Sequence, residues 1–152
     1  MRMRVVSVLA VLLAATAFAA PPSSATPPSH RLQLKEIVRL WSERLNAGDN
    51  AGVARLFRLP ATIVQATTYG FHTREQLARF HSLLPCSGRI MSIVVKGRYA
   101  TAVFELGDRP GSRCDSRGVL VAARFEIVGG KIASWEQIPV PRNQDPLNPK
   151  VL

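Results

Sequence analysis

The sequence has few of the residues that enzymes use for metal and nucleophilic chemistry. Its 152 residues include 2 cysteines, 3 histidines and 10 acidic side chains. It contains no His-Glu-x-x-His zinc motif, no Gly-x-Ser-x-Gly nucleophile motif and no glycine-rich phosphate loop. Two cysteines without further ligands at close spacing do not make a zinc site. We therefore expect no metal and no cofactor.

Negative charge is also scarce. Lys and Arg number 20 against 10 Asp and Glu, a formal net charge of +10, while 47% of the residues are hydrophobic. This hydrophobic content excludes a disordered basic tail, and the length excludes two domains of ordinary size. The basic residues are spread along the chain and not interleaved with aromatic ones, so we expect no nucleic-acid partner. The charge fits a solubilising surface, or weak attraction to anionic lipids or polysaccharides.

Residues 1–19 predict a Sec-type signal peptide. Arg2 and Arg4 precede an apolar run over residues 5–15, and Ala17 and Ala19 are the small residues that a signal peptidase needs. The alternative, a membrane anchor, would need a longer apolar run before the prolines that follow. Cleavage leaves 18 basic and 10 acidic side chains, a net charge of +8. We expect an exported protein, periplasmic or extracellular, without a stable membrane span.

Proline-rich segments delimit one domain. Residues 20–30 are rich in Pro and Ser and predict an extended linker, and residues 141–152 predict a Pro-rich tail. The folded domain is then 31–140, with regular structure ending near residue 138, because proline cannot donate to a strand ladder. Export places Cys86 and Cys114 in an oxidising compartment, which favours a disulfide over the alternative of two buried thiols.

Apolar spacing predicts three helices in the first half of the domain. The first covers residues 34–45, and the second is capped by Asp49 and ended by Pro60. The third opens on a capping box of Thr73 and Gln76. Residues rich in β-branched side chains lie between the last two helices and predict a strand over 61–69.

After residue 88 the pattern changes to that of strands. They are predicted over residues 89–95, 99–106, 118–128 and 131–138, with tight turns at 96–98 and 129–130. The order ααβαββββ predicts an α+β fold in which the helices cover one face of a largely antiparallel sheet. Pairing of the first two of these strands would bring Cys86 and Cys114 to the same end of the sheet.

Three short motifs accompany this order. They are Asn-Ala-Gly-Asp at 46–49, His-Thr-Arg-Glu-Gln-Leu at 72–77 and Gly-Lys-Ile-Ala-Ser-Trp-Glu-Gln at 130–137. With the element order they resemble the nuclear transport factor 2-like superfamily, which includes ketosteroid isomerases and SnoaL-like polyketide cyclases. The resemblance covers residues 33–139. It implies a cystatin-like fold, a cone-shaped curved antiparallel sheet wrapped by three N-terminal helices, with a small apolar pocket and often a homodimer. It does not fix an activity.

The catalytic groups of ketosteroid isomerases are missing at the positions that the resemblance assigns to them. Trp41 stands in place of the tyrosine that donates to the oxyanion, Gln65 in place of the aspartate base, and Ala122 in place of the second acid. Of the Asp–Arg–Asp set of limonene epoxide hydrolase-like members, only Glu105 keeps a carboxylate. Glu105 is therefore the candidate base of any reaction.

Strand alternation puts Glu105, Ala122 and Arg124 on one sheet face. Pairing across the turn at 129–130 places Arg124 near Trp135 and Ala122 near Gln137. The resemblance identifies this face as the inside of the cone. The candidate pocket residues are Trp41, Gln65, Glu105, Arg124, Trp135 and Gln137. Alternatively, Glu105 and Arg124 are solvated at the rim or paired.

The opposite face of these strands is apolar. It carries Phe104, Leu106, Val119, Val121, Ala123 and Phe125. Such a surface should not stay exposed to water, so it is either the interface of a homodimer, which we expect, or the true inner face.

These observations favour an exported, non-catalytic module that binds a small, mostly apolar molecule in a conical pocket. One alternative is a SnoaL-like cyclase, isomerase or hydrolase that uses Glu105 as its base. The other is an envelope protein-interaction module.

Overall fold

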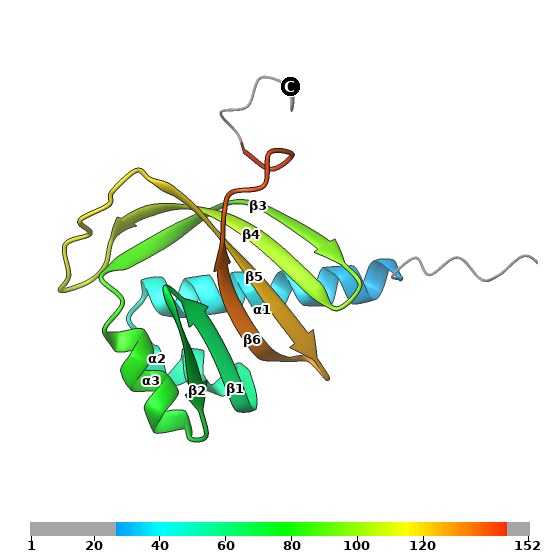
Figure 1. Cartoon of the computed structure of the whole chain (residues 1–152), viewed down its shortest axis with the longest axis horizontal. Helices are drawn as coiled ribbons and strands as arrows, with labels where there is room; N and C mark the ends of the chain where they lie inside the picture. Colours follow the sequence, from blue (N-terminus) through cyan, green and yellow to red (C-terminus); the bar gives the residue numbers. More distant parts are fainter. Residues whose placement is uncertain (1–26, 146–152) are drawn as a thin grey trace, which may run out of the picture.

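The computed structural model describes residues 27–145 as three helices and six strands (Figure 1). In chain order these are α1 (Pro28–Asn46), α2 (Asn50–Arg55), β1 (Phe57–Gln65), β2 (Thr67–Phe71), α3 (Arg74–Ser82), β3 (Cys86–Lys96), β4 (Tyr99–Asp108), β5 (Leu120–Val128) and β6 (Lys131–Ile138). No helix within residues 27–145 is long and apolar enough to cross a membrane. The predicted signal peptide lies outside the described residues.

The helix ends follow the capping signals of the sequence. The Asp49 carboxylate accepts the backbone N–H of Gly52 at the start of α2, and Thr73 and Gln76 form the predicted capping box of α3. α1 begins earlier than predicted, at Pro28, so residues 28–30 of the predicted linker are helical. Proline is tolerated there because the first N–H groups of a helix have no partner within it.

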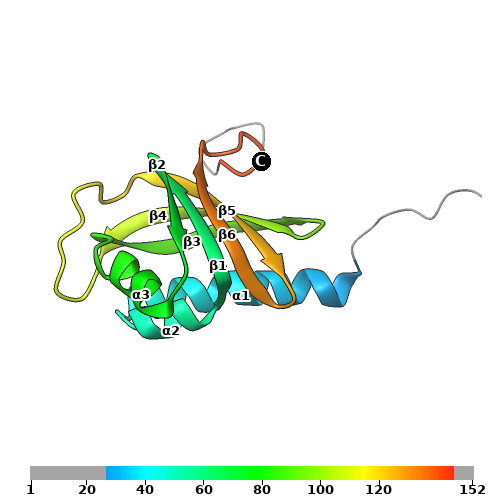
Figure 2. The ribbon, with the colours of Figure 1, turned by 60° about the horizontal axis from the view of Figure 1, so that its bottom comes forward.

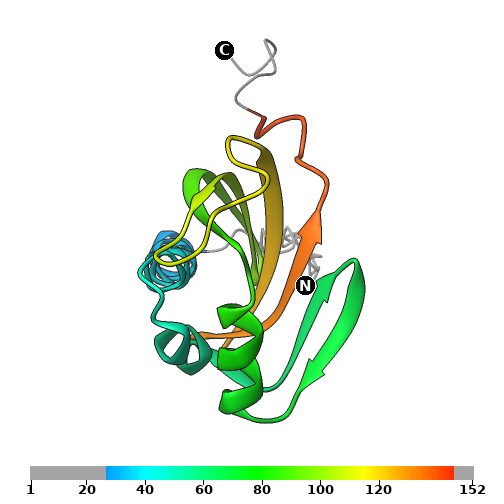
Figure 3. The ribbon, with the colours of Figure 1, turned by 90° about the vertical axis from the view of Figure 1, so that its left-hand side faces the viewer.

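The strands form one curved, open sheet in the order β2-β1-β6-β5-β4-β3 (Figure 3). Four of the five neighbouring pairs are antiparallel, but β1 and β6 are parallel, so the sheet is mixed and not wholly antiparallel. β6 returns beside β1 after the β3–β4–β5 meander. This brings the ends of the first and last strands together, with Val64 opposite Glu136.

The segment between α2 and α3 departs from the prediction of one strand. The chain reverses at Ala66, whose φ is 55°, and forms two antiparallel strands, β1 and β2. Pro60 lies inside β1 and does not end a helix. It falls where the β1–β6 register shifts between Phe57 and Thr62, a position at which the missing N–H breaks no ladder bond.

α1 lies across the concave face of the sheet (Figures 2 and 3). The ring centroid of Trp41 is 5.1 Å from that of Phe125 and 5.9 Å from that of Phe104. Ser42 and Asn46 of α1 donate to the Gly88 carbonyl on edge strand β3, and the Asn46 side-chain oxygen accepts the Gly88 N–H. The helix therefore covers both the apolar face and part of one sheet edge.

The last described residues run across the convex face. Ser92, Val103, Ala122 and Ile138 are neighbours in one row across β3, β4, β5 and β6. The chain leaves the sheet at Ile138, and Gln144 accepts a hydrogen bond from Ser92 at the other end of the row. Residues 139–144 therefore cross over Val103 and Ala122, which are 0% and 1% exposed although no helix covers this face.

Candidate ligand-binding pocket

A cavity of about 420 Å³ lies between α1 and the concave sheet face, at the end of the molecule that holds the disulfide. α1 contributes Trp41 and Leu45, and the loop before β5 closes one side with Val119. The apolar sheet face supplies most of the floor: Phe104, Leu106, Val121 and Ala123. The size is that of an ordinary small-molecule site, and the lining is mainly apolar.

Four of the predicted pocket residues line this cavity: Trp41, Gln65, Trp135 and Gln137. Gln65 and Gln137 follow the pair Val64–Glu136, so the parallel contact of β1 and β6 puts these two residues next to each other. Gln65 is half-buried and Gln137 is exposed. They are the polar groups of the β1–β6 side of the cavity.

The indole N–H of Trp41 is already used. It donates to His81 Nε2 at 3.3 Å, and His81 Nδ1 lies 2.8 Å from the Leu77 carbonyl. An imidazole that accepts at Nε2 must carry its proton on Nδ1. Burial, with a smaller contribution from the nearby Arg109 charge, lowers the pKa of His81 to about 4. Trp41 therefore offers the cavity its ring and not its N–H group.

The indole N–H of Trp135 has no partner. Trp135 is 6% exposed and lines the cavity, with its ring 6.0 Å from that of Trp41. Within residues 27–145, its Nε1 is the one buried side-chain nitrogen or oxygen without a hydrogen-bond partner. Buried donors in folded proteins are nearly always paired. Trp135 therefore carries an unpaired, buried donor next to the cavity.

Glu105 and Arg124 do not line the cavity, contrary to the prediction. Both lie on the convex face, where Glu105 pairs with Arg89 at 2.7 Å and Arg124 pairs with Glu136. The prediction had joined them to Trp135 and Gln137 through a β5–β6 register that is wrong, because β6 has one extra residue. Glu126 pairs with Ser134 and Ile127 with Ile132, so Ala133 has no counterpart in β5. A one-residue slip moves each side chain to the other face.

The same shift corrects the predicted dimer interface. Phe125 is opposite Trp135 and Ala123 is opposite Gln137, so the apolar face turns inward. Phe104, Ala123 and Phe125 belong to the buried core beneath α1. The face that was expected to bind a second copy is therefore the inside of the domain, and the alternative that it faces inward is correct.

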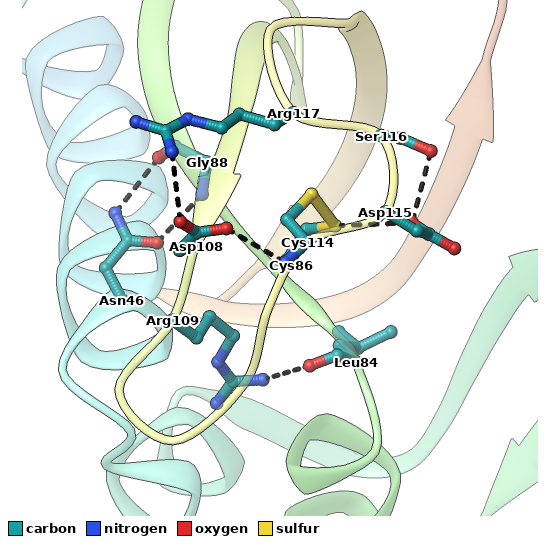
Figure 4. Close-up of a disulfide and its surroundings, with 10 residues drawn as sticks. All are labelled: Asn46, Leu84, Cys86, Gly88, Asp108, Arg109, Cys114, Asp115, Ser116 and Arg117. Atoms are coloured by element: carbon teal, nitrogen blue, oxygen red, sulfur yellow. Dashed lines mark hydrogen bonds and ion pairs between the residues drawn. A yellow bond between two sulfur atoms is a disulfide. The ribbon is translucent and has the colours of Figure 1, made fainter.

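A disulfide joins the rim of the cavity to β3. Cys86 and Cys114 are bonded, with a Cα–Cα distance of 4.6 Å, as predicted (Figure 4). Asp108 stands opposite Cys86 in the β3–β4 pair and accepts the backbone N–H of Cys114 at 3.0 Å. Arg109 donates to the carbonyls of His81 and Leu84 and so anchors the start of the loop.

One charged side chain lines the cavity among the described residues. Asp115 is exposed on the rim, where Ser116 donates to its Oδ1 at 3.2 Å. The Asp115 Oδ1 also lies 3.9 Å from Cys86 Sγ, and with Cys114 these atoms are the one described grouping of metal-ligand type. Its two sulfurs are bonded to each other and so are not thiolates.

The sequence-based list missed the apolar lining and the rim. Leu45, Phe104, Val119, Val121 and Asp115 were not predicted as pocket residues, although all line the cavity. The available signal was the apolar alternation of residues 104–125, because a sheet with one covered face turns its apolar side inward.

The sequence matches no family model and no curated protein sequence. Similar solved structures include a putative ketosteroid isomerase from Kribbella flavida, at 16% identity and a TM-score of 0.59, over 77% of this chain and 89% of that one. A putative polyketide cyclase from Sinorhizobium meliloti has 18% identity and a TM-score of 0.56, over 68% of this chain and 94% of that one. A protein of ketosteroid isomerase-like fold from Catenulispora acidiphila, solved with trimethylamine, has 18% identity and a TM-score of 0.59, over 72% of this chain and 88% of that one.

Proposed function

We propose that this chain binds a small, uncharged, mostly apolar molecule that carries one hydrogen-bond acceptor, and that it does so without catalysis. Its fold is the nuclear transport factor 2-like fold, which ketosteroid isomerase-like and SnoaL-like proteins share. The observation that carries this proposal is the unpaired, buried N–H of Trp135, a residue that lines an apolar cavity of about 420 Å³. A carbonyl or ether oxygen of the ligand is the acceptor that this donor lacks.

Two further observations support binding without catalysis. No basic side chain is among the described residues of the lining, which disfavours an anionic ligand. The one carboxyl group there, Asp115, is exposed on the rim, whereas a catalytic base works best with a pKa raised by burial. Glu105 is on the other sheet face and pairs with Arg89, so it is not proposed as a base.

The proposed place of action is outside the cytoplasm. The disulfide is compatible with an oxidising compartment. Native mass spectrometry of the protein purified from its own cells tests the function most directly. We expect a retained neutral molecule, and empty protein in repeated preparations would count against the proposal.

The role of Trp135 can be tested with a matched ligand pair. Benzophenone and diphenylmethane have nearly the same shape and differ in one carbonyl oxygen. We expect benzophenone to bind more tightly, and Trp135→Phe to weaken its binding about fivefold to tenfold, because one buried hydrogen bond is lost. Diphenylmethane should bind both proteins alike. Isothermal titration calorimetry measures both affinities.

Glu105→Gln is the control, because its side chain points to the convex face. It should leave both affinities unchanged. Equal binding of the two ligands would refute the Trp135 contact, and a loss in Glu105→Gln would refute the assignment of the cavity.

A further inference from the structure

Three tips of the molecule lie together at the end opposite the disulfide (Figures 1 and 2). They are the first turns of α1, the β3–β4 turn at 97–98 and the β5–β6 turn at 129–130. The Arg98 carbonyl accepts the Ile127 N–H at 2.9 Å, which ties the β3–β4 turn to β5. Gln33 of α1 lies beside Gly130: its Nε2 is 3.7 Å from where a Cβ of that residue would stand.

These tips carry an excess of positive charge, which we call the basic end. It consists of Arg31, Lys35, Arg55, Lys96, Arg98 and Lys131. Lys131 Nζ donates to the Arg55 carbonyl at 2.8 Å, which places the last residue of α2 beside the β5–β6 turn. The acidic side chains on these elements are Glu36 of α1 and Glu126, which pairs with Arg98 at 2.8 Å. Six cations therefore stand against two carboxylates.

The basic end is far from the cavity along the strands. β3 runs from Cys86, which lines the cavity, to Lys96, and β6 runs from Lys131 to Gln137, which also lines it. A surface that binds the basic end therefore contacts other residues than those that line the cavity.

We infer that the basic end docks on an anionic lipid surface. Three convex tips suit a broad, flat surface, and each Lys or Arg near such a surface is attracted by its negative potential. Leu32, 65% exposed on α1 between Arg31 and Lys35 in the sequence, adds an apolar side chain for the headgroup region. A single-stranded nucleic acid would instead need a row of stacking aromatic side chains in a groove, and Tyr99 alone is exposed here.

The test is co-sedimentation of the purified protein with vesicles of phosphatidylcholine, with or without phosphatidylglycerol. We expect binding to the anionic vesicles at low ionic strength, weak binding to the neutral ones, and release at about 0.5 M salt, where surface charges are screened. The variant Arg31→Gln, Lys35→Gln, Lys96→Gln should bind the anionic vesicles about a hundredfold more weakly, at about fivefold per cation.

The matched control removes three cations from the cavity end, in α3 and the loop before β5: Arg79→Gln, Arg113→Gln, Arg117→Gln. Its affinity for the anionic vesicles should stay within about twofold of that of the unaltered protein if the basic end is the docking surface. None of the three residues changed at the basic end makes a side-chain hydrogen bond or ion pair in the described part of the chain, so folding is not at risk.

Three results would overturn the inference. The first is no binding of the unaltered protein to anionic vesicles at low ionic strength. The second is an equal loss in both triple variants, which would mean attraction by net charge alone. The third is binding to heparin or to single-stranded DNA, with the same dependence on the basic end, in the absence of vesicle binding.

Discussion

The buried imidazole of His81 determines what Trp41 can offer a ligand. His81 is 0% exposed and is held between the Trp41 N–H and the Leu77 carbonyl. Because both ring nitrogens are paired in the neutral form, protonation would break the bond from Trp41 and bury a charge. The hydrogen bond from Trp41 to His81 therefore holds α1 to α3.

This arrangement predicts a loss of stability in mild acid. The pKa of His81 is lowered to about 4 by burial, whereas an unfolded histidine has its usual value of 6.5. The unfolded chain therefore binds the proton first. The contribution of neutral His81 to the free energy of unfolding is complete above pH 6.5. It is lost as the pH falls towards 4, and the loss is on the order of 3 kcal/mol.

Urea unfolding at pH 7, 5.5 and 4 measures this effect. The difference in unfolding free energy between the unaltered protein and His81→Gln should shrink over that range, because glutamine does not titrate. The matched control is His72→Gln, which removes an exposed histidine in place of the buried one. A constant difference for His81→Gln would contradict the prediction.

At the scale of elements, the loop between β4 and β5 depends on two attachments. The disulfide holds its middle, and Arg109 holds its start through the carbonyls of His81 and Leu84 and the side chain of Asn50. Arg109 is 8% exposed, and burial lowers its pKa. This loop contributes Val119 and Asp115 to the cavity, so the attachments also shape the pocket.

Removing the disulfide should weaken both the fold and the pocket. The bridge joins residues 28 positions apart, and in the chain-entropy model its loss costs about 3 to 4 kcal/mol. We expect the unfolding free energy of the double variant Cys86→Ser, Cys114→Ser, measured by urea unfolding, to be lower by this amount. We also expect this variant to bind benzophenone more weakly. Addition of a reductant to the unaltered protein should give the same result. Unchanged affinity in the folded variant would show that the rim does not need the bridge.

At the scale of the whole molecule, the two faces of the sheet have different covers. α1 covers the concave face, and residues 139–144 cross the convex face over Val103 and Ala122. The rest of the convex face carries ion pairs, such as Arg124 with Glu136 and Arg98 with Glu126. The C-terminal segment therefore protects the apolar part of a face that is otherwise polar.

Deletion of residues 139–152 should therefore destabilise the domain. Exposing Val103 and losing the bond between Ser92 and Gln144 should lower the unfolding free energy by about 2 to 3 kcal/mol. Urea unfolding measures the change, and Gln144→Ala should show only the smaller, hydrogen-bond part of it, about 1 kcal/mol. A truncated protein as stable as the full chain would mean that the segment covers nothing of importance.

Local signals in the sequence determined the parts that local physics controls. Asp49, Thr73 and Gln76 fixed two helix starts, because their side chains satisfy N–H groups within the same turn. Gly129 and Gly130, with φ of 59° and 73°, fixed the β5–β6 turn, because glycine accepts positive φ. Cys86 and Cys114 could be paired, because no other cysteine competes.

The tertiary structure alone decided which side of the sheet is inside and which residues meet at the pocket. The unpaired Ala133 in β6 shifts the β5–β6 register, so that Trp135 and Gln137 share a face with Phe125 and not with Arg124. Gln65 and Gln137 became neighbours through the parallel pairing of β1 and β6, strands far apart in the chain. Neither the bulge at Ala133 nor the pairing of β1 with β6 has a local signature in the sequence, because both depend on the packing of the whole sheet against α1.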